Sequence, residues 1–218
     1  MFMATHLIGF GGGGGAPVTL SFTASPGEPT NSTTYTFSAV SIGTPAADRQ
    51  VVVAVANDGS TRTVSSVTVG GTGLSSIVSI NSTSTVHIWA GTIAAGTTAD
   101  IVVTLNAISD GLAIGVWAMT GAAVGASATG TSTASPGSVA IAVPASGAII
   151  AMCEHDVNGA NITWGGGITE DYDAGVDTNF GHSGASSITL GGTTPTITST
   201  YASGAPAPGM IAASWAPA

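Results

Sequence analysis

The sequence predicts an all-β fold, an antiparallel β-sandwich of jelly-roll-like type with a flexible glycine-rich N-terminal arm. Three observations predict it. Thr, Val, Ile, Ser and Gly dominate the 218 residues, and these residue types favour strands and turns. Strand-sized segments recur roughly every 8 to 12 residues between Gly, Pro, Asn and Asp, as in sandwiches and barrels. No segment keeps a helical period over three turns.

The arm spans residues 1–16 and precedes a sandwich domain at 17–218. Five consecutive glycines occupy 11–15, and such a run behaves as a flexible linker. It does not form a phosphate-binding loop, because no Gly-Lys-Ser/Thr follows it. The apolar residues of the arm are candidate anchors to a partner: Phe2, Leu7, Ile8 and Phe10.

The expected strands follow in order. The segment at 50–56 is apolar after its first residue, as a central strand buried on both faces would be. The segment at 35–42 alternates, as a half-buried strand does. A polar loop is expected at 125–136. The other expected strands lie at 18–24, 63–69, 74–80, 85–93, 99–105, 112–120, 138–143, 148–154, 161–164, 179–187, 196–201 and 210–215.

Two segments of the chain have similar sequences. Residues 65–72 read Ser-Ser-Val-Thr-Val-Gly-Gly-Thr, and residues 186–193 read Ser-Ser-Ile-Thr-Leu-Gly-Gly-Thr. Either both are strands that enter the same Gly-Gly turn, or the chain arose by duplication, with a seam near 125–137. The first interpretation is preferred, with a single sandwich that uses strands from both halves.

The charge balance excludes several classes of function. The chain has two Arg, no Lys and eleven acids, for a net charge of −9. It therefore lacks the basic patch that nucleic-acid binding and docking on anionic lipid require. The uncharged stretch at 111–153 is broken by prolines and its apolar runs are strand-sized, so no membrane insertion is expected. The single cysteine, Cys153, allows no internal disulfide.

Three tryptophans and one arginine are expected to be structural. Trp89, Trp117 and Trp215 lie within apolar strands and are assigned to the core. Arg49 precedes the most apolar strand. We expect its guanidinium to form an ion pair or to cap backbone carbonyls rather than to bind an anion.

Six of the eleven acids lie between residues 154 and 177. Cys153 is expected to end a buried strand, with the charged residues after it opening a loop. Aromatic and carboxylate side chains together suit a surface that binds sugars by stacking and hydrogen bonds. The candidate contacts with a glycan at the protein surface are Trp164, Glu170, Asp171, Tyr172, Asp173 and Phe180.

The same stretch offers other chemistry that we favour less. Asp171, Asp173 and Asp177 could present oxygens to Ca²⁺, although the spacing is not that of an EF-hand; no metal is assigned. His87, His155 and His182 could each serve as a general base, but no nucleophile elbow is present. No catalytic residue and no cofactor are expected.

Several segments carry a resemblance to a known group. Tyr35-Thr36-Phe37-Ser38, Asp48-Arg49-x-Val51-Val52-Val53-Ala54-Val55, Gly115-Val116-Trp117-Ala118-Met119-Thr120-Gly121 and Ala212-Ala213-Ser214-Trp215 are among them. From about residue 17 onward the chain resembles tailed-bacteriophage virion proteins of tail-fibre or head-decoration type. The resemblance implies a β-sandwich in a virion, usually multimeric, with no known chemistry.

The expected function is that of a non-enzymatic tail-fibre or tail-tip module for host-surface adhesion, in a virion assembled in the host cytoplasm. The alternative is a capsid decoration (cement) protein anchored by its arm, and an outside alternative is a polysaccharide hydrolase. The expected partners are other virion proteins, copies of the chain itself, with a trimer favoured, and a host-surface glycan.

Overall fold

The computed structural model describes residues 15–59, 62–81, 85–155, 162–201 and 209–218. Over these residues the chain forms strands and no helix. The first half contains β1 (Thr19–Ala24), β2 (Gly27–Glu28), β3 (Ser32–Ser41), β4 (Gln50–Asn57), β5 (Val64–Val69), β6 (Thr72–Gly73), β7 (Ser75–Asn81), β8 (Thr85–Thr92), β9 (Thr98–Ser109) and β10 (Leu112–Thr120). The second half contains β11 (Ala128–Ser132), β12 (Gly137–Ala140), β13 (Ala148–His155), β14 (Ile162–Gly165), β15 (Thr169–Gly175), β16 (Gly181–Ser187), β17 (Thr196–Tyr201) and β18 (Gly209–Trp215).

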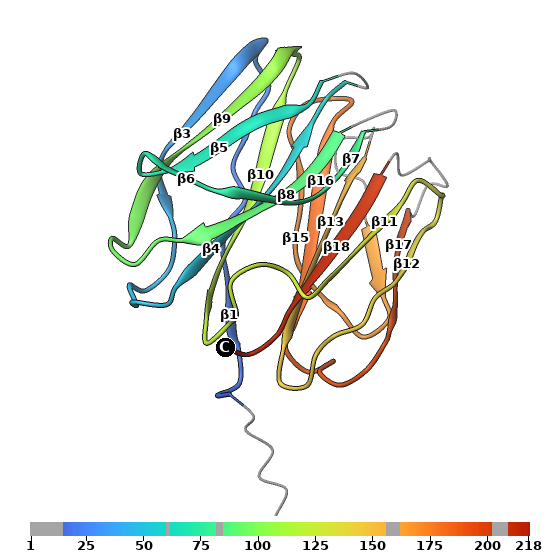
Figure 1. Cartoon of the computed structure of the whole chain (residues 1–218). Coiled ribbons are helices and arrows are strands. Elements are labelled where there is room, and N and C mark those ends of the chain that lie inside the picture. Colours follow the sequence, from blue (N-terminus) through green and yellow to red (C-terminus); the bar gives the residue numbers. More distant parts are fainter. Residues whose placement is uncertain (1–14, 60–61, 82–84, 156–161, 202–208) are drawn as a thin grey trace, which may run out of the picture.

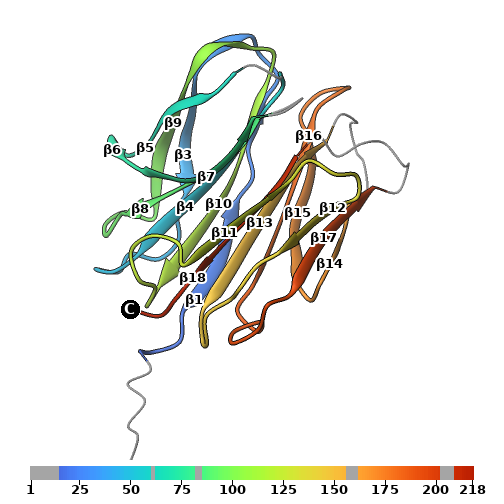
Figure 2. The same cartoon turned by 45° about the vertical axis from the view of Figure 1, so that its right-hand side comes forward.

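These strands form four antiparallel sheets (Figures 1 and 2). The first outer sheet has the order β3-β9-β5-β6, and the first inner sheet has the order β1-β10-β4-β8-β7, with β2 paired to β10. The second inner sheet has the order β11-β18-β13-β16-β15, and the second outer sheet has the order β12-β17-β14. The predicted all-β antiparallel sandwich class is confirmed.

Each sheet is drawn from one half of the chain, and the two halves share one strand order. If β2 and β6 are set aside, the remaining strands β1 to β10 correspond one by one to β11 to β18. Each inner sheet then runs first-eighth-third-sixth-fifth, and each outer sheet runs second-seventh-fourth. The expectation of one sandwich with mixed strands is therefore wrong. Two sandwiches of the same topology are joined through residues 121–127, as a duplication would produce.

The similar segments at 65–72 and 186–193 do not occupy equivalent positions in this repeat. Residues 65–69 belong to β5, whose counterpart is β14, whereas residues 186–187 end β16, whose counterpart is β8. The two segments share only the pattern of a strand that enters a Gly-Gly turn.

Three hydrophobic cores separate the four layers. One core lies between the first outer and first inner sheets, one between the two inner sheets, and one between the second inner and second outer sheets. Both inner sheets are therefore covered on both faces. As a result β4 and β13 are buried at every position, which confirms the central strand predicted at 50–56.

The structure confirms the predicted structural roles of Arg49 and three tryptophans. The Arg49 guanidinium is fully buried and donates to the backbone carbonyls of Ile93, Gly43, Gly96 and Ala95 at 2.7–2.9 Å. This planar fork of donors holds the 93–96 turn against the entry to β4. Trp89, Trp117 and Trp215 are buried in the cores.

The central core, between the two inner sheets, depends on close backbone approach at one edge. The Tyr172 ring stacks on Phe22 with ring centroids 5.2 Å apart, and Phe22 meets Trp117 edge-on at 5.7 Å. A Cβ atom at Gly184 would lie 2.4 Å from Cε1 of Tyr172, and one at Gly115 would lie 2.4 Å from its hydroxyl oxygen. The tyrosine therefore occupies space that only glycine leaves open.

Replacing Gly184 by alanine should lower the free energy of unfolding by about 1–3 kcal/mol, because the buried ring cannot move aside without repacking. Urea unfolding followed by tryptophan fluorescence measures the change. Gly73→Ala is the matched control, since a Cβ at Gly73 meets nothing within 4 Å, and its effect should stay within about 0.5 kcal/mol. Equal unfolding midpoints for the two variants would contradict this account of the core.

Candidate functional site

The acidic stretch does not form a solvated loop. Glu154 and His155 continue β13 and are buried, so the prediction that Cys153 ends the strand is wrong. Cys153 and His155 point toward the second outer sheet, and Glu154 points toward the central core, as alternation along a strand requires. Asp156 lies outside the described residues.

Two of the predicted surface aromatics are core residues instead. Tyr172 is 8% exposed and Phe180 is fully buried; both pack in the central core. The cause for Tyr172 is a bulge in β15, since Glu170 pairs with Ala185 and Tyr172 pairs with the adjacent Gly184. The extra residue, Asp171, turns Tyr172 to the opposite face from Glu170. A continuous exposed patch of these aromatics and carboxylates is therefore absent.

The other predicted contact residues are mostly engaged in structural bonds. Trp164 is half-buried and donates from Nε1 to Ser183 Oγ at 2.8 Å. Asp171 Oδ2 accepts from Trp117 Nε1 at 2.8 Å. Asp173 lies 3.2 Å from His155 Nε2 and accepts the Ile162 backbone N–H at 2.8 Å. Glu170 alone of the six is exposed.

The three aspartates considered for Ca²⁺ are not brought together. Asp171 faces Trp117 and Asp173 faces His155, while Asp177 accepts the backbone N–H of Asn179. Throughout the part of the chain that the structure describes, no three His, Cys, Asp or Glu side chains gather as a metal site would require.

The pKa shifts along this stretch follow from burial. Desolvation raises the pKa of Asp171, and hydrogen bonds from Ser186 and Trp117 partly oppose the rise. Desolvation raises the pKa of the Cys153 thiol far above its usual value, and the charge of Asp173 adds to this. The thiol therefore stays protonated and is a poor nucleophile.

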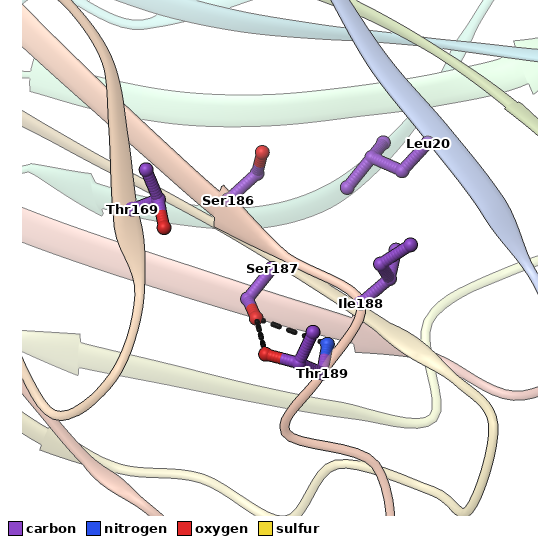
Figure 3. Close-up of a pocket in the computed structure, with 6 residues that line it drawn as sticks. All are labelled: Leu20, Thr169, Ser186, Ser187, Ile188 and Thr189. Atoms are coloured by element: carbon purple, nitrogen blue, oxygen red, sulfur yellow. Dashed lines mark hydrogen bonds between the residues drawn. The ribbon is translucent and has the colours of Figure 1, made fainter.

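A small pocket lies where β1 of the first half meets β15 and β16 of the second (Figure 3). Its volume is about 220 Å³. Ser187 and Thr189 bond to each other through their hydroxyls at 3.1 Å, and Ile188 beside them is 49% exposed. The lining offers hydroxyl and methyl groups but no ionisable side chain, which suits a small neutral ligand rather than acid–base chemistry. Its residues are Leu20, Thr169, Ser186, Ser187, Ile188 and Thr189.

Sequence reasoning did not find this pocket. Residues 186–189 resemble residues 65–68 in sequence, but no sequence signal places them beside Leu20, which is distant in the chain. The candidate anchors Phe2, Leu7, Ile8 and Phe10 lie outside the described residues.

Comparisons with protein-family models, with curated proteins and with solved structures found no match to this chain. Within the described ranges, no helix is long and apolar enough to cross a membrane.

Two of the candidate general bases, His87 and His182, are buried in their neutral form. Both ring nitrogens of His87 and of His182 lack a hydrogen-bond partner among the residues that the structure describes. Desolvation lowers the pKa of His87 to about 4. Desolvation, with the neighbouring His155, lowers the pKa of His182 to about 3. Both imidazoles therefore stay uncharged at neutral pH and serve packing.

These shifts predict acid sensitivity. Because each folded-state pKa lies below the unfolded value of 6.5, the unfolded chain takes up protons first as the pH falls below about 6.5. The stability that each neutral imidazole contributes is present above pH 6.5 and is lost toward its folded pKa. Between pH 7 and pH 5, each histidine should cost about 2 kcal/mol of unfolding free energy.

Urea unfolding at pH 7 and pH 5 tests this for the wild type and for His87→Leu and His182→Leu. Each variant should lose about 2 kcal/mol less than the wild type on acidification, whatever its stability at pH 7. A variant with the full wild-type loss would show that its histidine is not the cause.

Proposed function

We propose that this chain is a non-enzymatic structural module of a tailed-phage virion, attached through its N-terminal arm and acting at the tail fibre or tail tip in host-surface adhesion. The observation that carries the proposal is where the two ends of the described chain lie. Gly15, where the arm meets the sandwich, lies against the Ala218 carbonyl oxygen, since a Cβ at Gly15 would lie 2.2 Å from that atom. The first described residue and the C-terminus therefore lie at the same end of the four-layer body (Figures 1 and 2).

The same end offers an apolar contact to a partner. Val124, in the connection between the halves, is 85% exposed, and the neighbouring Ala123 N–H bonds to the Ala216 carbonyl at 2.9 Å. Ala218 in turn bonds to the Gly121 carbonyl at 2.9 Å. We assign this exposed valine, on a connection that backbone bonds hold in place near Gly15, as an apolar contact for the partner.

The charge distribution supports a fixed assembly. Glu28, Asp48, Asp100, Asp110 and Glu170 are exposed acids, while Arg49 is buried. So few charges give little protection against edge-to-edge contact in solution. Repeated copies held by a shell or tail would cover such surfaces.

Deleting residues 1–15 should leave the sandwich folded but remove the protein from virions, because the deletion takes the arm and spares every strand. Melting temperature and incorporation into particles are measured side by side. Gly73→Ala, which keeps the arm and Val124 and adds a Cβ that meets nothing within 4 Å, is the matched control and should incorporate. Full incorporation of the truncated protein would exclude arm-mediated attachment.

The copy number and location in virion images separate the two virion roles. A few copies at the tail tip, with purified protein that competes for adsorption to host cells, would support adhesion. Copies on the order of hundreds, enough to cover a symmetric shell, would support the cement alternative, in which the same arm binds the capsid.

A further inference from the structure

Strand β1 lies at one edge of the first inner sheet. It pairs with β10 on one side and stands at the end of the strand order. Within the residues that the structure describes, no strand pairs with its other side. The backbone N–H and C=O groups along that side are therefore available to an added strand.

The central core is incompletely covered along this edge. Leu20 and Phe22 of β1 and Ala174 of β15 pack against the central core but are only half-buried. Ile188, which lies near Leu20 in Figure 3, is 49% exposed. An apolar strip therefore remains in contact with solvent where β1 meets the second half. We call these four residues the edge strip.

A hollow lies on each face of β1. The seam pocket contains Leu20 and Ile188 and lies on the side of the central core. A second pocket, of about 340 Å³, lies on the other face, where Thr19 and Ser21 meet β10 and the turn before β4. Successive side chains of a strand point to opposite faces of its sheet. A strand laid along β1 would therefore place alternate side chains over the two hollows.

The sequence of the N-terminal arm suits these hollows. Residues 5–10 read Thr-His-Leu-Ile-Gly-Phe. In a strand, Leu7 and Ile8 would point to opposite faces, and Phe10 would share the face of Ile8. Residues 1–14 contain no Asp, Glu, Lys or Arg. Among the described residues, the lining of both hollows likewise offers no charged group except the guanidinium of Arg49, which is fully buried.

The length of the arm allows it to reach β1 of its own chain. Gly15 precedes Leu20 by five residues, so at most about 18 Å separates them. Ile8 precedes Gly15 by seven residues and reaches up to about 25 Å from it. The glycines at 11–15 admit the backbone angles that a chain reversal requires. The tether gives the chain's own arm a high effective concentration, whereas the arm of a second copy must arrive by diffusion.

We propose that, in the free protein, residues 5–10 pair antiparallel with β1 as an added edge strand, with Leu7 and Ile8 over the hollows on its opposite faces. This pairing removes apolar side chains of the arm and of the edge strip from water. The inference goes beyond the proposed function, because it concerns the arm before attachment. A virion partner must then displace the arm from β1.

Disulfide trapping in the full-length protein tests the pairing. The chain has one cysteine, Cys153, which is fully buried and does not compete for oxidation. One variant combines Leu7→Cys with Ile188→Cys, and a second combines Ile8→Cys with Ile188→Cys. Matched controls carry the second cysteine at Ile108 instead, which is 58% exposed but belongs to β9 of the first outer sheet.

One of the two Ile188 variants should form a disulfide within the chain about fivefold faster than the other, because adjacent strand residues face opposite sides. It should also exceed both Ile108 controls about fivefold. Equal rates for the two Ile188 variants, or rates no higher than the controls, would overturn the proposal. Disulfides that join two chains and slow on dilution would assign the edge strip to the arm of a second copy, which overturns it equally.

Hydrogen exchange measures the docked arm without cysteines. The amides of β1 should exchange about tenfold more slowly in the full-length protein than in a protein that lacks residues 1–15, because their outward N–H groups donate to the added strand. Ile8→Pro should abolish this protection, since proline interrupts strand pairing. Ile8→Val keeps the strand preference and is the matched control. Exchange of β1 that the deletion leaves unchanged would contradict docking on β1.

Virion incorporation separates this inference from the proposed function. Protein locked by the disulfide to position 188 should enter virions only after reduction, because the arm must leave β1. Entry of the locked protein without reduction would overturn the displacement step. Loss of incorporation on deletion of residues 1–15, with no trapping and no protection of β1, would overturn docking alone. A truncated protein that incorporates would exclude arm-mediated attachment and leave docking on β1 supported by its own two tests.

Discussion

Burial of both inner sheets on both faces is the constraint on which the rest of the structure depends. The inner sheets pack against each other and are each covered by an outer sheet, so β4 and β13 have no face toward water. Every polar group in these layers must be bonded or uncharged. Arg49 meets this requirement with four carbonyl acceptors, and His87 and His182 meet it by remaining neutral. The near-absence of charge from β4 and β10 follows from this architecture, because these strands have no face toward water.

The central core joins two sandwiches of equal topology, yet its edges differ. On one edge Phe22, Trp117 and Tyr172 form an aromatic cluster, which Gly115 and Gly184 admit by lacking side chains. Asp171 closes this cluster through its bond to Trp117. Asp171, Tyr172 and Phe180, three of the predicted ligand contacts, therefore hold the halves together.

Local pattern predicted much of the fold. The apolar run at 50–56 predicted a strand buried on both faces. Arg49 before it predicted an ion pair or a carbonyl cap, and the structure shows the cap. Residues 128–132 lie within the expected loop at 125–136 but form β11. They are a strand because they pair with β18, whereas their sequence of Ala, Thr, Gly and Ser has little strand signal of its own. The prediction that Tyr172 is a surface contact was wrong for a different reason. One bulged residue reverses which face a side chain occupies, and sequence alternation does not mark bulges. Duplication was the less favoured of the two interpretations, because the halves share pairing order rather than residues.

The pairing of first and last strands in each half sets an order of events during synthesis. Strand β1 pairs with β10, and β11 pairs with β18, so the first sandwich can close once Thr120 has left the ribosome. Its inner face, including Val52, Ile88 and Met119, then remains open to water until the second sandwich follows. A nascent chain at this stage presents a broad apolar sheet surface, the kind that aggregates or engages chaperones. The second half thus acts toward the first as an attached partner subunit, delivered by the same ribosome at a fixed one-to-one ratio.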